Sequence, residues 1–483
     1  MIGPLSESLA VALRRASSRL DPPPTPIVSI AVHVAVLGTW VALFLLAFGR
    51  GGIVAWSIGL AYLGYDIALQ VFTGWQIRRI SDRVDRTVPR TAGVARPSVA
   101  VIVAAHNEAA VLPATLAALL GQTDAPEEVL IADDGSTDGT AEMLCARFGF
   151  VMPESGGGTP AVRVGATALR WLRLAHGGKA AALNAALLQT AADLIITVDA
   201  DTVVGTPAIG AVRSAFSVEP ELVAVTGVIT PGCRPTPVGR VMQWFQTYEY
   251  IRNFTARYAW MRIGCLQLIS GAFAGFRRDA VYRVGGFDSC MVEDYELVAR
   301  MYRFAGDHGL DWRFRVLAGA QARTEAPASV PGFLRQRRRW FGGFLQTQWW
   351  YRGMVGDPRF GRLGMIMLPI KAFDTVQPLF GLTAFGLLIY FVVAGRFDVV
   401  GPVLVILAVK LAVDVLFHLW VLGRYRRWVG DPHRASIAAA AAAMVVEPLT
   451  FTLLLQTGAI LGWIAFLGGS QRWDPQIRFG VGD

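Results

Sequence analysis

Long apolar runs occupy both ends of the 483-residue chain and are absent from its middle. Residues 27–48, IVSIAVHVAVLGTWVALFLLAF, form one run, and residues 52–73 form a second in which Asp66 is the only charged residue. Because about 20 consecutive apolar residues let a helix cross a bilayer, each run predicts one transmembrane helix. The first run is too long for the core of a cleavable signal peptide, and no small-residue cleavage site follows it.

Three further apolar blocks lie in the C-terminal part of the chain, at residues 363–395, 399–422 and 437–468. The first and last are too long for one plain span, so each is expected to join an interfacial helix to a spanning one. Glu447-Pro448 marks the expected break in the last block, because proline interrupts a helix. These blocks predict about three C-terminal spans.

Arginines flank these runs unevenly. The loop between the first two runs carries only Arg50, whereas several arginines precede the first run and follow the second. Cytoplasmic loops are enriched in Lys and Arg, so the pattern predicts a multi-pass inner-membrane protein with a cytoplasmic N-terminus and a cytoplasmic central region. The arginines in question are Arg14, Arg15, Arg19, Arg78, Arg79, Arg83, Arg86, Arg90 and Arg96, with Arg424, Arg426, Arg427 and Arg434 in a second cytoplasmic loop.

Between the apolar ends, short β-rich runs alternate with Ala- and Leu-rich helical patterns. The runs SVAVIVAAHN, EVLIADDGS, DLIITVDADTVV and VAVTGVI have the composition of buried strands. Strands that alternate with helices predict an α/β fold with a doubly wound, mostly parallel sheet. We therefore divide the chain into an N-terminal membrane region (1–97), a cytoplasmic domain (98–345) and a C-terminal membrane region (346–483).

Polar residues stand where three of these strands end. Ligands of doubly wound sheets bind beyond the carboxyl ends of the strands, so these side chains are expected on one rim. They are Asn107, Glu108, Asp133, Asp134, Asp199 and Asp201.

Asp199 and Asp201 form a D-x-D pair at the end of the apolar strand ITV. In an extended chain they would point the same way, and their repulsion would favour a cation between them. Hard oxygen ligands that share coordination with phosphates suit Mg²⁺ or Mn²⁺. A solvated turn is the alternative interpretation of so short a motif.

Two further segments carry candidate chemistry. In HGGKAAALNAAL, Lys179 stands at a glycine-preceded helix start, where backbone N–H groups and an ammonium together suit a diphosphate. In the segment MVEDYEL, either Glu293 or Asp294 could be a general base, whose pKa neighbouring charges would set. The alternatives are an ordinary exposed lysine and two acids that stabilise a helix start.

The stretch FLRQRRRWFGGFLQTQWW, residues 333–350, places four arginines within five residues among aromatic side chains. Taken alone, it predicts a basic amphipathic helix on an anionic membrane surface. Arg337 and Arg338 are interpreted as interfacial charge, and Trp349 and Trp350 as anchors at the level of the lipid headgroups.

Composition limits the remaining classes. The hydrophobic fraction of 53% exceeds that of ordinary soluble proteins, in line with membrane spans. Much of the net charge of +9 stands beside those spans, so nucleic acid is not an expected partner. The four cysteines are widely spaced and lack a C-x-x-C pair, which argues against a disulfide framework and against a zinc site.

Taken together, the motifs AHNE, ADDGSTDGT, GGKAAALN, DAD, SGAFAG, VEDYEL and Q-R-R-R-W resemble, in order and spacing, the membrane-integrated, processive members of glycosyltransferase family 2. These are the cellulose, chitin, hyaluronan and poly-N-acetylglucosamine synthases and the nodulation chitooligosaccharide synthase. The resemblance covers about residues 98–345 by motif and the whole chain by layout. It implies a glycosyltransferase A (GT-A) fold, a UDP-sugar donor, a divalent cation and an inverting mechanism that leaves a β-linkage.

The resemblance also implies roles for individual residues. Asp294 matches the catalytic base, with Glu293 beside it, and Asp201 matches the principal metal ligand, with Asp199 as its neighbour. On the donor side it implies Asn107, Glu108, Asp134, Lys179, Asp199 and Arg339, and on the acceptor side it implies Ser270, Gly271, Gln336 and Trp340.

One position departs from the family pattern, because Val292 replaces the threonine of the usual Thr-Glu-Asp triplet. This affects the expected fit of the acceptor more than the assignment of the base.

The expected activity is therefore processive polymerisation of a sugar from UDP-N-acetylglucosamine, with UDP-glucose next, into an exopolysaccharide that leaves through the transmembrane region. Transfer of sugar to a membrane lipid acceptor is one alternative, and an inactive membrane scaffold or channel subunit is another. The expected partners are the donor, the growing polysaccharide or lipid acceptor, and membrane lipids, and a separate regulatory or export subunit is compatible with this scheme.

Overall fold

The computed structural model describes residues 4–80, 96–430 and 436–469. Arg83, Arg86, Arg90 and Arg434, which contribute to the expected orientation, lie outside these described residues.

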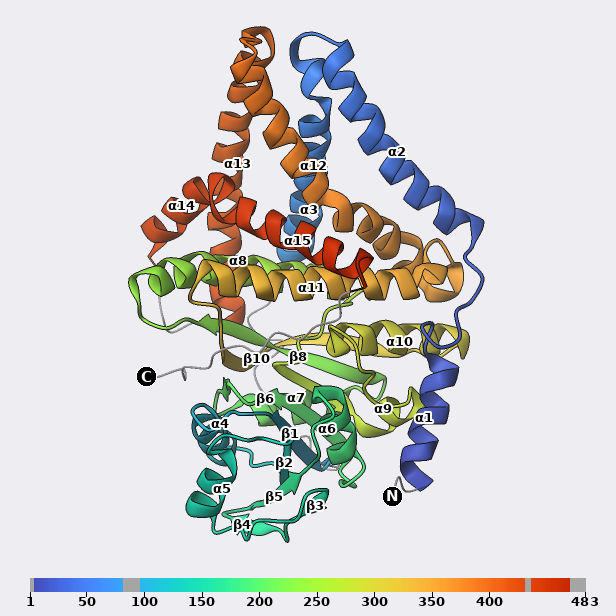
Figure 1. Cartoon of the computed structure of the whole chain (residues 1–483), viewed down its shortest axis with the longest axis vertical. Helices are drawn as coiled ribbons and strands as arrows, with labels where there is room; N and C mark the ends of the chain where they lie inside the picture. The colour runs from blue at the N-terminus through green and yellow to red at the C-terminus, as the bar shows by residue number, and fades with distance from the viewer. Residues whose placement is uncertain (1–3, 81–95, 431–435, 470–483) are drawn as a thin grey trace.

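The described chain forms three layers (Figure 1). Long helices stand at the top of the view, further helices lie across the middle, and an α/β domain lies below them. The long apolar helices are α2 (Ile27–Gly49), α3 (Ser57–Ile77) with the short helix η1 (Gly52–Trp56) before it, α12 (Leu368–Val393) and α13 (Phe397–Val429). Each is long and apolar enough to cross a membrane, with η1 counted as part of the second span and η4 (Leu363–Met367) as part of the third.

The last apolar block is a bent pair. Helices α14 (Ile437–Val446) and α15 (Phe451–Leu467) meet at 49°, and the 3₁₀ turn η5 (Glu447–Leu449) separates them. The bend thus falls at the predicted Glu447-Pro448 break. The pair counts as a fifth span, or as a re-entrant segment, because α15 lies across the molecule along α11 in Figure 1.

The middle layer consists of α8 (Pro237–Arg262), α11 (Val330–Trp350) and α15. The hydroxyls of Thr236 and Ser329 cap α8 and α11 by accepting hydrogen bonds from the N–H groups of Gly239 and Gly332 at 3.0 and 3.3 Å. The backbones of α11 and α15 touch where Gly342 meets Gly462, so a Cβ atom at either glycine would clash with the facing helix.

The central domain is a ten-stranded mixed sheet with the order β3-β5-β2-β1-β6-β9-β8-β10-β7, in which β4 pairs with β5. The pairs β1·β2, β1·β6, β2·β5 and β8·β10 are parallel, and β9 joins the two parallel groups by antiparallel pairing. The strands are β1 (Val99–Ala105), β2 (Glu128–Asp133), β3 (Gly157–Gly158), β4 (Val162–Val164), β5 (Thr167–Arg173), β6 (Leu194–Asp199), β7 (Thr202–Val204), β8 (Leu222–Gly232), β9 (Phe273–Arg277) and β10 (Arg313–Glu325).

The central strands are apolar along their whole length because helices cover both faces of the parallel part. The covering helices are α4 (Leu112–Leu120), α5 (Thr140–Phe148), α6 (Lys179–Leu187), α7 (Ala208–Val218), α9 (Arg278–Arg283) and α10 (Glu293–Asp307). The N-terminal helix α1 (Pro4–Ala16) contacts α9 and α10, and two short 3₁₀ turns, η2 (Arg352–Met354) and η3 (Pro358–Phe360), follow α11. The predicted doubly wound, mostly parallel sheet is thereby confirmed.

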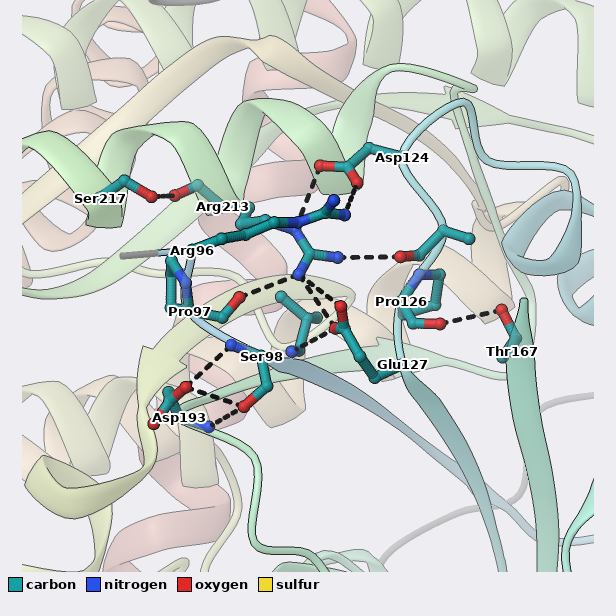
Figure 2. Close-up of polar contacts among 12 residues, drawn as sticks. Arg96, Pro97, Ser98, Asp124, Pro126, Glu127, Thr167, Asp193, Arg213 and Ser217 are labelled. Atoms are coloured by element: carbon teal, nitrogen blue, oxygen red, sulfur yellow. Dashed lines mark hydrogen bonds and ion pairs between the residues drawn. The ribbon is translucent and has the colours of Figure 1, made fainter. Parts of the chain in front are cut away.

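A buried arginine joins the amino ends of the strands, at the edge opposite the expected ligand rim (Figure 2). The Arg213 guanidinium donates hydrogen bonds to the carboxylates of Asp124 and Glu127 at 2.9–3.1 Å and to the carbonyl oxygens of Pro97 and Ala125. Because α7 carries this arginine and the loops carry its partners, the network fixes where β1 and β2 begin.

Candidate active site

The centre of the site is the side chain of Lys179, the first residue of α6. Its Nζ atom lies 2.7 Å from Oδ1 of Asp199 at the end of β6 and 2.8 Å from Oε1 of Glu293 at the start of α10. Burial by itself would lower the pKa of Lys179, but the charges of Asp199, Glu293 and Asp294 outweigh it and raise that pKa. Lys179 is therefore a charged bridge between acidic groups, and the alternative of an ordinary exposed lysine is wrong.

Asp294 lies beside this bridge. Its Oδ2 atom accepts a hydrogen bond from the N–H of Gly271 at 2.7 Å, and its Oδ1 atom accepts one from its neighbour Tyr295 at 2.8 Å. Burial raises the pKa of Asp294, and the negative charge of Glu293 raises it further, while Lys179 and the two backbone donors oppose both effects. A carboxylate held in this way, with a pKa above its ordinary value, has the properties of a general base.

The Cα atom of Gly271 lies close to both the carboxylate of Asp294 and the ammonium of Lys179. A Cβ atom added at this position would lie 3.1 Å from Oδ2 of Asp294 and 3.2 Å from Nζ of Lys179. The preceding residue, Ser270, donates its backbone N–H to the hydroxyl of Thr226 on β8 at 3.3 Å. The SGAFAG loop therefore lies against the base, and a small residue is needed for that approach.

Asp199 and Asp201 are not arranged as the sequence suggested. The strand β6 ends at Asp199, and residues 200 and 201 form a turn, because β7 then pairs antiparallel with β10. Asp201 is 5% exposed, and its Oδ1 atom accepts hydrogen bonds from the hydroxyls of Thr324 and Thr202 at 3.1 and 3.3 Å. Only the expectation of an extended D-x-D pair is wrong, since both carboxylates remain at the end of β6.

The remaining predicted donor residues form a second group around Asp134. This carboxylate is buried and accepts hydrogen bonds from the N–H groups of Gly177 and Gly178 at 2.7 and 2.9 Å, which fixes the loop that leads to Lys179. Asn107 has a positive φ of 58°, rare for a residue other than glycine, and its Oδ1 atom accepts a 2.7 Å hydrogen bond from the N–H of Thr137.

Glu108 closes the turn before α4, since its carbonyl oxygen accepts hydrogen bonds from the N–H groups of Val111 and Leu112. Asn107 and Glu108 thus shape the loops beside Asp134.

Two histidines complete this second group and were not among the predicted residues. The rings of His106 and His176 stack with centroids 4.5 Å apart, and Nδ1 of His176 lies 3.0 Å from Oδ2 of Asp134. One ligand atom from each of these three residues lies within 4.8 Å of the others, the spacing of a metal-binding group. The sequence signal for His106 was its position at the end of a predicted strand, whereas β5, the strand before His176, was not among the predicted runs.

Helix α11 holds the residues of the Q-R-R-R-W motif. Gln336 is buried, and Arg339 donates a hydrogen bond to the carbonyl oxygen of Met291, just before α10, at 3.2 Å. Arg337 is 2% exposed, pairs with Glu249 of α8 at 2.7 Å and lies over the ring of Trp340 at 4.4 Å. Our interpretation of Arg337 as interfacial charge is therefore wrong, because α8 supplies a buried carboxylate that local sequence does not reveal.

Comparison with known proteins finds similarity over the region that carries these residues. Residues 100–285 match the model described as "Glycosyl transferase family 2", and residues 194–419 match "Glycosyl transferase family group 2". Among curated proteins, the chain is 27% identical over 252 residues to a poly-beta-1,6-N-acetyl-D-glucosamine synthase of Staphylococcus epidermidis. These residues make up 51% of this chain and 54% of the relative. The synthase of that name from Staphylococcus aureus strain COL is 27% identical over 248 residues, 50% of this chain and 53% of the relative.

The chain thus spans about half the length of the curated relatives it matches. Among solved structures, the mannosyltransferase PcManGT from Pyrobaculum calidifontis, in complex with GDP-Man and Mn2+, is similar with a TM-score of 0.53 at 21% identity. The likeness covers 82% of this chain and 99% of that chain and shows the fold. The two family models together match residues 100–419, so this part of the chain is similar to the glycosyltransferases of family 2, and the likeness to PcManGT shows their glycosyltransferase A fold.

Proposed function

We propose that this protein is a processive, inverting β-glycosyltransferase that polymerises sugar from a UDP-sugar into an exopolysaccharide. The observation that carries the proposal is the convergence of Lys179, Asp199, Glu293, Asp294 and Gly271 at the ends of β6, α6 and α10. In this arrangement an ammonium, a group that suits a diphosphate, lies beside a carboxylate with a raised pKa.

In the proposed reaction, Asp294 takes the proton of an acceptor hydroxyl. That oxygen forms a bond to the anomeric carbon of the donor sugar while the bond from this carbon to the β-phosphate oxygen breaks. The electron pair leaves with UDP, and attack from the opposite face converts an α-linked donor into a β-linked product. Lys179 neutralises part of the charge on the departing diphosphate, and Gly271 leaves space for the terminal acceptor sugar beside the base.

The donor set at the end of β6 fits a divalent cation. Asp199 and Asp201 offer hard carboxylate oxygens, and Thr324 orients one of those on Asp201. We therefore propose that these two residues would hold Mg²⁺ or Mn²⁺. When bound, such an ion supplies positive charge to the leaving diphosphate.

Several observations support secretion through the helices of this chain. Polar side chains form hydrogen bonds and ion pairs within and between α3, α12, α13 and α15. Ionisable groups inside a membrane are costly and usually mark a pathway for polar groups. Tyr295, next to the base, bonds to Gln348 of α11, which in turn contacts Thr375 of α12. The further contacts are Lys371–Asp374, Tyr65–Asp374, Tyr62–Gln456, Asp66–Gln70, Gln70–Asp414, Lys410–Asp66 and Lys410–Asp414.

The favoured donor is UDP-N-acetylglucosamine, with UDP-glucose next, because the curated relatives are named as N-acetylglucosamine polymer synthases. The proposed location is the inner membrane with a cytoplasmic catalytic domain, in keeping with the arginines of the described loops.

The test is to incubate the full chain in nanodiscs with Mg²⁺ or Mn²⁺ and each radiolabelled UDP-sugar in turn, and to size the product on a gel. A long polymer from one donor, absent in Asp294→Asn, is the expected result. Short or lipid-linked product alone would contradict processivity, and turnover that survives Asp294→Asn would contradict the assignment of the base.

A further inference from the structure

Arg257, in the second half of α8, has buried nitrogens without partners. Its Nε and Nη1 atoms are inaccessible to solvent and form no hydrogen bond with any described residue. The guanidinium packs over the ring of Phe254, 4.5 Å from its centroid. A buried donor that lacks an acceptor costs free energy, so such a group is expected to meet one when a ligand is bound.

Other buried arginines of the chain each face a carboxylate, a partner that Arg257 lacks among the described residues. Arg213 faces Asp124 and Glu127, Arg300 faces Glu296 at 2.8 Å, and Arg337 faces Glu249 at 2.7 Å. No ion pair of Arg257 exists within residues 4–80, 96–430 and 436–469. Burial lowers the pKa of Arg257 to about 10, which still leaves it charged near neutral pH.

Arg257 lies close enough to the proposed base for their charges to interact. Its positive charge interacts electrostatically with Asp294 and with Tyr250 of α8. The same charge also interacts with that of Lys371 near the start of α12. Lys179, by contrast, meets the base from the side of Asp199 and β6. Helix α8, which carries Arg257, contacts α3 and α13 and lies between the α/β domain and the long helices through which a product would leave (Figure 1).

Three other buried atoms without partners in the described residues, on α11 and in the loop after α8, are hydrogen-bond acceptors. The Oε1 atoms of Gln336 and Gln346 on α11, and that of Gln267 after α8, are buried and have no hydrogen-bond partner in the described chain. Helices α8 and α11 are in contact through the buried Arg337–Glu249 pair. These oxygens need donors, whereas Arg257 needs acceptors. Sugar hydroxyls can do both, but a phosphate can only accept.

We propose that Arg257 recognises the acceptor by donating hydrogen bonds from Nε and Nη1 to oxygens of the terminal acceptor sugar. This inference rests on the proposed function. Because the residue binds acceptor and not donor, its removal raises the acceptor KM and leaves the donor affinity unchanged. A hydrogen bond to a charged group corresponds to a change in affinity of about tenfold to a hundredfold.

The experiment compares wild type with Arg257→Gln and Arg257→Lys in nanodiscs, with Arg262→Gln, an exposed residue at the end of the same helix, as the matched control. Three quantities are measured: the Kd of UDP, acceptor-independent hydrolysis of the UDP-sugar, and the KM for a soluble oligosaccharide acceptor. Thermal unfolding of each variant reports its folding. Arg257→Lys keeps a positively charged hydrogen-bond donor and serves as the test variant if Arg257→Gln fails to fold.

We expect Arg257→Gln to raise the KM for the oligosaccharide about tenfold or more, while the Kd of UDP and the hydrolysis of the UDP-sugar stay unchanged. The KM of Arg257→Lys should lie between those of wild type and Arg257→Gln, and Arg262→Gln should match wild type. An unchanged acceptor KM in Arg257→Gln would overturn the proposal, as would an equal loss of donor affinity. Loss of transfer to a polyprenyl phosphate but not to the oligosaccharide would overturn the sugar as ligand. A wild-type protein that turns over no UDP-sugar contradicts the proposed function itself.

Discussion

The backbone N–H of Gly271 donates a 2.7 Å hydrogen bond to Oδ2 of Asp294, which joins the loop before β9 to the start of α10. Because the same glycine faces Nζ of Lys179, this contact sets the distance between the proposed base and the bridging ammonium. Any side chain at position 271 must displace one of the two.

The first prediction concerns Gly271→Ala. The added Cβ would lie 3.1 Å from Oδ2 of Asp294, so the base or the lysine must move. Small displacements of reacting groups cost about hundredfold in rate, and we expect a loss of that order in sugar transfer. The unfolding free energy should fall by only about 1 kcal/mol. Gly386→Ala in α12, where nothing lies within 4 Å, is the control. Full activity of Gly271→Ala would contradict this account.

The pH dependence of transfer should shift in opposite directions in two variants. Asp294 acts as a base when deprotonated, so activity rises as the pH passes its raised pKa. Glu293→Gln removes a charge that raises this pKa and should move the acidic limb of the pH–rate profile to lower pH. Lys179→Met removes a charge that lowers it and should move the limb to higher pH. The pH dependence of kcat/KM in each variant measures these shifts. If the acidic limb moved in the same direction in both variants, Asp294 would be excluded as the titrating group.

Metal dependence gives a third prediction. EDTA should abolish transfer, and Mg²⁺ or Mn²⁺ should restore it, because Asp199 and Asp201 are proposed to hold the ion. Thr324→Val removes the 3.1 Å hydrogen bond that orients Asp201 and should weaken metal affinity about tenfold to a hundredfold. Thr123→Val, at an exposed hydroxyl, serves as control. Metal titrations of the rate provide the measurement, and equal behaviour of the two variants would remove Thr324 from this role.

The buried pair of Arg337 and Glu249 gives a fourth prediction, on stability. Arg337→Met leaves Glu249 buried without its partner and should cost about 3–5 kcal/mol of unfolding free energy. Burial raises the pKa of Glu249 and Arg337 opposes this, so the variant binds a proton more readily when folded. Its deficit should therefore be largest at high pH and shrink as the pH falls and Glu249 is protonated.

Thermal unfolding at several pH values in nanodiscs measures this effect. Arg335→Met, at an exposed arginine of the same helix, should change stability by less than about 0.5 kcal/mol. Equal losses in the two variants would show that Arg337 acts as surface charge after all.

Patterns that act over short distances along the chain were readable from the sequence alone. The apolar runs predicted α2, α3, α12 and α13, because the bilayer sets a minimum length that any spanning helix must reach. The strands β1, β2, β6 and β8 were predicted for a similar reason, since burial on both faces demands continuous apolar residues. The acids at the strand ends also indicated where the site would lie.

Only tertiary structure decided which groups meet. Nothing local in the run QRRRW distinguishes Arg337 from its neighbours, and it is buried because the face of α11 that carries it packs against Glu249 of α8. A turn, and not extended chain, joins Asp199 to Asp201 because β7 pairs with β10, a partner more than a hundred residues away. Arg257 becomes a candidate because the fold buries its Nε and Nη1 atoms without a partner in the described chain and brings its charge within reach of that of Asp294 on α10. The sequence determined the elements through local periodicity, whereas contacts between distant elements decided the charge, burial and partners of each functional group.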